Sequence, residues 1–203
     1  MIKRIILFLY IIFAFGHEYP KGWEELQSEM NWELIKETER IKIFSKDISV
    51  SPLSAFKAEL ISHVDKKILI NTAWNVENSM EVFPNAYMIE TGIYKWNGNN
   101  RYTAFQIFNI PFLAKRLYQF NSIFLGDSIH WTKTDTIKNS NKILLPPLNF
   151  GNWKVEKIGN KSKITYRLCT DPGGKVPIWI VKKATQHYLP QMLLDLENYA
   201  KSN

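Results

Sequence analysis

The chain has 203 residues and a formal net charge of +7, and its length is enough for one sizeable domain. Its content of 45% hydrophobic and 22% charged residues is that of an ordinary globular protein. The basic residues are spread among 19 acidic ones instead of forming a concentrated stripe, so we expect no nucleic-acid partner. We interpret the basic excess as a solvated surface, and attraction to an anionic membrane surface is the functional alternative.

The first 16 residues have the pattern of a secretory signal peptide. Lys3 and Arg4 form a positive start, and an unbroken apolar run of 11 residues follows from Ile5 to Phe15. A spanning helix needs roughly 20 apolar residues, so this run is too short for one. We predict cleavage after Gly16, which leaves one domain, residues 17–203, as a secreted or periplasmic protein. An uncleaved anchor is the alternative.

Two short helices precede or interrupt a long series of strands. Residues 18–30 favour a helix with Trp23, Leu26 and Met30 on one face, and residues 66–75 favour a second helix. From residue 32 onward, most segments alternate apolar and polar residues with a period of two, which predicts β-strands. The nine predicted strands cover residues 32–35, 41–44, 56–61, 87–96, 101–110, 115–125, 128–136, 153–158 and 163–170.

Three dipeptides between these strands are typical of tight hairpin turns, because glycine accepts a positive φ. They are Asn97-Gly98, Gly126-Asp127 and Gly159-Asn160. Successive hairpins imply antiparallel pairing. A long antiparallel sheet with a segregated helix is an α+β architecture, and a strongly twisted sheet of this length curls. A curled sheet closed by a helix leaves space for a ligand cavity.

The C-terminal stretch predicts that closing helix. Asp171 to Gly174 reads Asp-Pro-Gly-Gly, a turn in which proline fixes φ and two glycines permit positive φ. A helical pattern follows from Ile178 to Tyr199. Pro190 lies inside it, so we expect a bend there, because the carbonyl of Gln186 loses its partner.

This helix is predicted to be amphipathic. We place Lys183, His187, Glu197 and Asn198 on its solvent face. The opposite, apolar face consists of Ile178, Val181, Thr185, Tyr188, Leu189, Met192, Leu196 and Tyr199. An apolar stripe of this length needs a sheet to cover it.

The segment from Asp171 to Val181, followed by Leu189 to Leu193, resembles the START domain, the steroidogenic-acute-regulatory-protein-related lipid-transfer family. Weaker matches lie at Ile41–Ser45 with Trp32, at Phe56–Glu59 and at Gly151–Trp153, so the resemblance spans roughly Trp23 to Asn198 and is greatest to bacterial secreted members. It implies a helix-grip (START/Bet v 1-like) fold, in which a curved antiparallel sheet wraps the C-terminal helix. It also implies a tunnel for one lipid or sterol. Most members are carriers or sensors and not enzymes.

Family members often carry an Arg-Asp-Phe/Tyr segment after a proline. Here Arg116 and Tyr118 match it, but Leu117 stands where the acid would be. Arg116 is therefore a candidate polar anchor in a cavity wall, or else a surface arginine. From strand alternation and the centre of the helix stripe, the predicted ligand-binding residues are Tyr102, Gln106, Phe108, Arg116, Tyr118, Phe120, Tyr188 and Met192.

Other chemistry is sparse in the sequence. The four histidines have no metal-ligand partners at a usual spacing, no phosphate loop or nucleophile elbow is present, and Cys169 reads as a buried, inert thiol. We therefore predict no cofactor and a non-enzymatic monomer that binds a hydrophobic small molecule. Lys175, Lys182 and Lys183 are placed to contact anionic headgroups. The alternatives are a cyclase- or hydrolase-type enzyme on the same scaffold, and an interaction protein whose core is filled by its own side chains.

Overall fold

The computed structural model describes residues 19–137, 139, 143–174 and 176–202. The predicted signal peptide and Lys175 lie outside these residues. Within them, no helix is both long enough and apolar enough to cross a membrane.

The chain forms one nine-stranded sheet in which every neighbouring pair is antiparallel, with the order β1-β2-β3-β9-β8-β7-β6-β5-β4. The nine predicted strands are confirmed. Gly98, Gly126 and Gly159 have positive φ in the three predicted hairpin turns. The strands are β1 (Glu33–Glu37), β2 (Ile41–Lys46), β3 (Ala55–Ser62), β4 (Met88–Trp96), β5 (Arg101–Phe108), β6 (Arg116–Phe124), β7 (Ser128–Lys133), β8 (Leu148–Ile158) and β9 (Lys161–Asp171).

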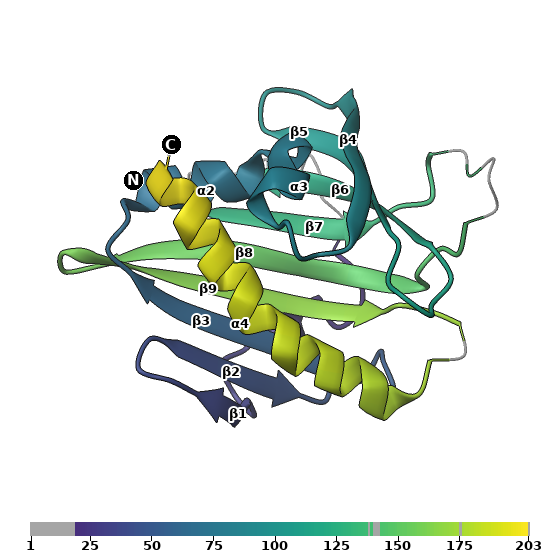
Figure 1. Ribbon diagram of the computed structural model, residues 1–203, viewed down its shortest axis with the longest axis horizontal. Coiled ribbons are helices and arrows are strands. Elements are labelled where there is room, and N and C mark those ends of the chain that lie inside the picture. The colour runs from purple at the N-terminus through teal and green to yellow at the C-terminus, as the bar shows by residue number, and fades with distance from the viewer. Residues whose placement is uncertain (1–18, 138, 140–142, 175, 203) are drawn as a thin grey trace, which may run out of the picture.

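The sheet curls around a long C-terminal helix, α4 (Ile178–Ser202), which crosses its concave face (Figure 1). The predicted α+β, helix-grip architecture is confirmed. The helix α2 (Lys66–Trp74), a 3-10 turn η1 (Val76–Asn78) and the short helix α3 (Ser79–Val82) lie on the same side as α4. Together they enclose the main core, and α4 continues through Pro190 without a break.

The opposite, convex face carries the first helix, α1 (Trp23–Gln27), and a smaller core. Trp23 and Leu26 pack there against Phe150 and Cys169, as an amphipathic helix predicts. The helix is shorter than predicted, so Met30 lies beyond its end and is exposed. Burial raises the pKa of the Cys169 thiol to about 12, so the thiol is protonated at neutral pH and the predicted inert character has a physical cause.

The second half of α4 contains a departure from the predicted amphipathic pattern. Glu197 was placed on the solvent face, which is wrong, because its side chain is only 2% exposed. It accepts hydrogen bonds from the Arg40 guanidinium at 2.6 Å and from the Ser62 hydroxyl at 2.6 Å, and Lys201 lies 3.0 Å away. Arg40 precedes β2 and Ser62 ends β3, so this carboxylate fastens the last turns of α4 to the sheet edge.

Candidate ligand-binding site

The six predicted site residues on the strands share one face of the sheet. The β5–β6 register pairs Tyr102 with Ser122, Gln106 with Tyr118 and Phe108 with Arg116. Tyr102, Tyr118 and Phe120 belong to the core that also contains α4, so this shared face is the concave one. The alternation predicted which residues share a face, and the structure shows that this face is the concave one.

Two of these residues lie against the short helices beside α4. The Tyr102 ring is 4.3 Å from the Trp74 ring, centre to centre, and its hydroxyl donates to the Trp74 carbonyl at 3.1 Å. The Gln106 amide donates to the Ser79 hydroxyl at 3.2 Å. These contacts join the sheet to α2 and α3. Phe108 is the last residue of β5, and its ring packs edge-on against Tyr118 at 5.3 Å.

An aromatic wall, formed by Trp131, Trp153 and Tyr166, occupies the centre of the concave face. The ring centres of Trp131 and Tyr166 are 5.4 Å apart, those of Trp153 and Tyr166 are 4.3 Å apart, and Phe83 stacks on Trp153 at 6.4 Å. The three residues of the wall belong to the buried core, with only 8–9% of their surface exposed. The sequence prediction missed the wall because it considered only two strands and the helix.

Gly151 on β8 makes this wall possible. A Cβ at this position would lie 2.1 Å from the Arg167 carbonyl oxygen and 2.5 Å from the Trp131 indole. The register places Gly151 directly opposite Trp131, so the indole packs over bare backbone.

Three phenols converge on the same interior from β6, β9 and α4. Burial raises the pKa of Tyr166, and the nearby Tyr188 and Tyr118 raise it further. Burial also raises the pKa values of Tyr118 and Tyr188. All three hydroxyls are therefore protonated at neutral pH, and that of Tyr118 is hydrogen-bonded to the Thr170 side chain.

Asp195 on α4 adds a carboxylate that the sequence reading did not select. It is 9% exposed and lies on the same flank of the helix as Tyr188 and Met192, and its charge contributes to the raised pKa of Tyr188. Oδ1 accepts a hydrogen bond from the Gln191 amide at 2.7 Å, whereas Oδ2 has no partner among the described residues. A buried acceptor without a hydrogen-bond donor lowers the stability of the folded protein, so Asp195 Oδ2 is an unusual feature of this interior. The sequence signal that could have identified Asp195 is the position of a carboxylate within the apolar stripe of the helix.

Arg116 is 2% exposed, so the surface alternative is wrong. Its Nε donates to the Pro172 carbonyl at 3.1 Å, Nη2 donates to the Gly173 carbonyl at 3.3 Å, and Nη1 donates to the Ala114 carbonyl. The guanidinium thus ties the β5–β6 loop to the turn before α4. In that turn Gly173 and Gly174 have φ of 69° and 77°, as predicted. A role of Arg116 as ligand anchor stays a prediction.

The rim beside Arg116 exposes large apolar side chains. Phe112, in the β5–β6 loop, is fully exposed, and Ile178 and Trp179 at the start of α4 are more than half exposed. The predicted apolar stripe is therefore buried only from Leu189 onward, and the first half of α4 lies outside the core. The Lys183 ammonium lies 5.6 Å above the Trp179 ring.

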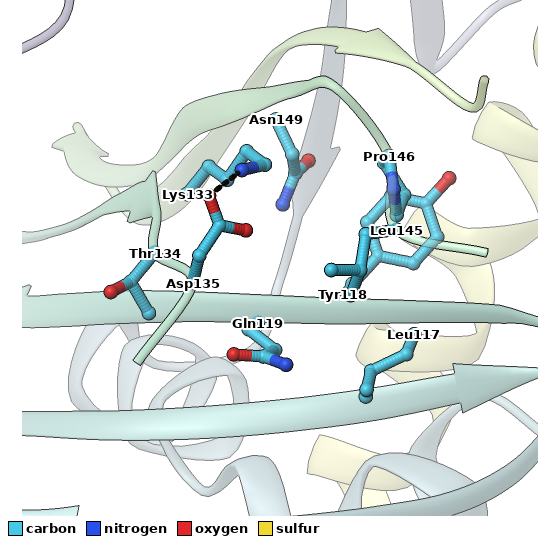
Figure 2. Close-up of a pocket in the computed structure, with 9 residues that line it drawn as sticks. All are labelled: Leu117, Tyr118, Gln119, Lys133, Thr134, Asp135, Leu145, Pro146 and Asn149. Carbon is cyan, nitrogen blue, oxygen red and sulfur yellow. Dashed lines mark hydrogen bonds and ion pairs between the residues drawn. The ribbon is translucent and has the colours of Figure 1, made fainter. Parts of the chain in front are cut away.

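Two surface hollows lie away from α4. Figure 2 shows a narrow crevice, too small to hold a ligand, between β6 and the chain that leads into β8, lined by Tyr118 among others. A wider groove of about 320 Å³ lies between Tyr19–Lys21 and β7–β8. Neither contains the aromatic wall. Among the described side chains, no three His, Cys, Asp or Glu residues come together as a metal site would require.

Neither a scan against family models nor a comparison with curated protein sequences yields a match. Solved structures do match. A STAR-related lipid transfer protein from Xanthomonas axonopodis is 17% identical with a TM-score of 0.74, over 84% of this chain and 99% of that one. Human STARD10 is 16% identical with a TM-score of 0.74, over 87% of this chain and 76% of that one.

The protein has the START-domain fold. At these identities the similarity concerns the fold and not the ligand. The same START-like architecture extends to the Zhui aromatase/cyclase from Streptomyces, which is 9% identical with a TM-score of 0.52, over 72% of this chain and 90% of that one. The site must therefore be argued from its own residues.

Proposed function

We propose that the protein binds one hydrophobic ligand, a lipid or a sterol-like molecule, against the aromatic wall between the START sheet and α4. The packed aromatic cluster of Trp131, Trp153 and Tyr166, in the core that the sheet shares with α4, is the observation that carries this proposal. Apolar surface buried there contributes roughly 25 cal/mol per Å². The similarity to the STAR-related lipid transfer protein from Xanthomonas axonopodis supports the same class of ligand.

The polar groups beside the wall favour a ligand with a hydroxyl or another hydrogen-bond donor at one end. Asp195 Oδ2 accepts from such a group, and the protonated hydroxyls of Tyr166 and Tyr188 donate in return. A free fatty acid would place a second carboxylate beside Asp195, which is unfavourable in an apolar interior.

Loading requires α4 to move, because its second half packs tightly on the sheet. Leu193 and Leu196 are fully buried, whereas the first half of the helix is mostly exposed. We therefore propose that the first half lifts while Glu197 holds the second half in place. Phe112 and Trp179 would enter a lipid surface at the rim, and Lys182 and Lys183 would contact anionic headgroups.

Ligand occupancy is tested by native mass spectrometry of protein purified from its own compartment. We expect a co-purified lipid in the wild type and its loss, by about ten-fold or more, in Trp153→Ala, since one large ring supplies several kcal/mol of contact. Tyr94→Ala, at an exposed site on β4, is the control and should retain the lipid. A wild-type protein that stays empty in every lipid extract would contradict the proposal.

Membrane contact is tested by transfer of a fluorescent lipid between vesicles. The double variant Phe112→Asp, Trp179→Asp should slow transfer to anionic vesicles by about ten-fold, because two exposed rings lose favourable burial in the lipid surface. Tyr94→Asp makes the same change away from the rim and should leave the rate unchanged. Equal rates in all three proteins would refute the rim as the contact surface.

We also propose that the mature protein works outside the cytoplasm, on the basis of the positive start and apolar run before Gly16. The molecular mass of the purified protein would show whether cleavage occurs there.

A helix-grip enzyme acting on an apolar substrate is the second candidate, and the similarity to an aromatase/cyclase favours it. The groups available for proton transfer near the wall are Tyr118, Tyr166, Tyr188 and Asp195. Turnover of a polyketide-like substrate that disappears in a folded Tyr166→Phe variant, while binding persists, would favour catalysis over carriage.

A further inference from the structure

Three cationic side chains are buried on the convex face, on the opposite side of the sheet from α4. Lys46 on β2, Lys57 on β3 and Arg167 on β9 are each at most 7% exposed. They lie under the segment between α1 and β1, which includes Ser28 to Trp32. A buried positive charge requires a partner, because its removal from water is costly.

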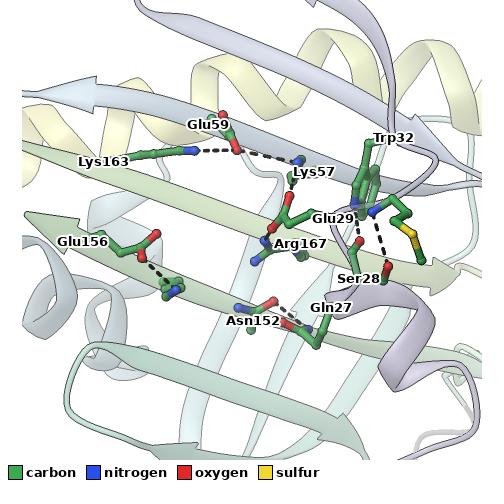
Figure 3. A network of polar contacts seen from close by, with 12 residues as sticks. Gln27, Ser28, Glu29, Trp32, Lys57, Glu59, Asn152, Glu156, Lys163 and Arg167 are labelled. Atoms are coloured by element: carbon green, nitrogen blue, oxygen red, sulfur yellow. Dashed lines mark hydrogen bonds and ion pairs between the residues drawn. The ribbon is translucent and has the colours of Figure 1, made fainter. Parts of the chain in front are cut away.

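Two of the three cations, Lys57 and Arg167, share one carboxylate, that of Glu29, whereas Lys46 donates to the Glu25 and Ser28 carbonyls. Lys57 Nζ lies 2.7 Å from Glu29 Oε2, and Arg167 Nη2 donates to Oε1 (Figure 3). Burial alone would raise the pKa of Glu29, but the Lys57 hydrogen bond and the Arg167 charge outweigh it and lower that pKa, so the carboxylate is ionised at neutral pH. Its side chain is nevertheless 64% exposed, so it can leave without opening a core.

The cations themselves are held in place. The Trp32 ring lies 5.2 Å from the Lys46 ammonium and 5.3 Å from that of Lys57. Its indole N–H donates to the Ser28 carbonyl at 2.8 Å, and Lys46 donates to the same carbonyl at 3.2 Å. Cation–π contacts and backbone carbonyls therefore preorganise the ammonium groups whether or not Glu29 is present.

One donor in this cluster remains unsatisfied. Arg167 Nε is buried and has no hydrogen-bond partner among the described residues, whereas both oxygens of Glu29 are already engaged. Two further acids lie nearby: Glu59 is shared between Lys163 at 2.8 Å and Lys57 at 3.7 Å, and the charge of Glu25 acts on Lys46. These carboxylates thus leave one buried donor of the cluster, Arg167 Nε, without an acceptor among the described residues.

We propose that Lys46, Lys57 and Arg167 form a binding site for a phosphate-type oxyanion, and that the Glu29 carboxylate is a displaceable internal competitor for it. A tetrahedral oxyanion carries the third oxygen that Arg167 Nε needs, and arginine is suited to binding such a group through two nitrogens. The oxyanion belongs to free phosphate or to a phosphomonoester lipid headgroup, and the experiment separates these sources.

The test is a titration of the full chain with inorganic phosphate at low salt, followed by calorimetry and by the indole N–H resonance of Trp32. Glu29→Gln removes the competitor at an exposed position and should tighten phosphate binding by at least about ten-fold over the wild type. Glu24→Gln makes the same change in α1, at an exposed side chain outside the cluster, and should behave as the wild type.

Adding Arg167→Gln to Glu29→Gln should abolish binding. Because that variant removes a buried group, its folding is checked by circular dichroism. A second double variant, Glu29→Gln with Lys57→Gln, should also lose phosphate binding. It replaces the first double variant in the test if that variant does not fold. Phosphate should raise the melting temperature of Glu29→Gln more than that of the wild type.

A second arm uses phosphatidylcholine vesicles with ~20 mol% phosphatidic acid, whose headgroup is a phosphomonoester. Binding of Glu29→Gln to these vesicles that exceeds binding to pure phosphatidylcholine assigns the site to a lipid headgroup, whereas a response to inorganic phosphate alone assigns it to a soluble anion. If Glu29→Gln binds neither probe more tightly than Glu24→Gln does, the proposal is overturned and the cluster is a structural ion pair.

Discussion

Replacing Gly151 by alanine is expected to destabilise the protein by about 3 kcal/mol, at the upper end for over-packing of a core. The added Cβ would lie 2.1 Å from the Arg167 carbonyl oxygen, which belongs to the neighbouring strand and has little freedom to move. It would also lie 2.5 Å from the Trp131 indole. The substitution must therefore distort the β8–β9 ladder or expel a ring from the aromatic wall.

Urea denaturation, followed by circular dichroism, measures this loss of stability. Gly92→Ala on β4 is the matched control, because its Cβ would meet nothing closer than 3.3 Å, at the Phe105 ring, and its loss should be about 1 kcal/mol or less. Equal losses in the two variants would show that the crowding at Gly151 is relieved without strain. We also expect Gly151→Ala to lose bound lipid, since the wall includes Trp131.

Glu197→Gln is expected to destabilise the protein by about 2 kcal/mol at neutral pH, because hydrogen bonds between charged groups are lost from a buried carboxylate. Burial raises the pKa of Glu197, but hydrogen bonds from Arg40, Ser62 and Lys201 outweigh it and hold the pKa below its ordinary value. A depressed carboxyl pKa contributes stability above the pKa of the unfolded chain and loses it as the pH falls through the folded pKa.

The free energy of unfolding, measured from pH 7 down to pH 3, checks this expectation. The difference between the wild type and Glu197→Gln should shrink on acidification, because protonation removes the same charge from the wild type. Glu90→Gln, at an exposed position of β4, should show almost no difference at any pH. A constant difference across the range would mean that Glu197 acts through shape and not through charge.

The strands and hairpin turns follow from local signals, and so they could be predicted from the sequence. Alternation along β5 and β6 also placed Gln106 and Tyr118 on one face. The start of β8 was not predicted, because Gly151 interrupts the pattern for a reason that lies on another strand. Gly151 must lack a side chain because the Trp131 indole packs against it. A contact between two strands cannot be predicted from the sequence around Gly151.

The side chains of α4 show the same limit. A helical period of 3.6 correctly predicted that Leu189, Met192 and Leu196 are buried. It cannot predict that Arg40, which is distant in sequence, donates a hydrogen bond to Glu197. The pattern also could not show that the first half of the helix extends past the core. Arg116 is comparable, since its orientation was predictable and its backbone partners in the Asp-Pro-Gly-Gly turn were not.

The pairing of β3 with β9 governs the order in which the sheet can be completed during synthesis. Every other neighbouring pair of strands is consecutive in sequence, whereas Ser62 pairs with Ser162. The β1–β3 meander therefore keeps an open edge until β9 has left the ribosome, and closing so long a loop is slow. A nascent chain that ends before β9 therefore presents unpaired strand edges to other chains.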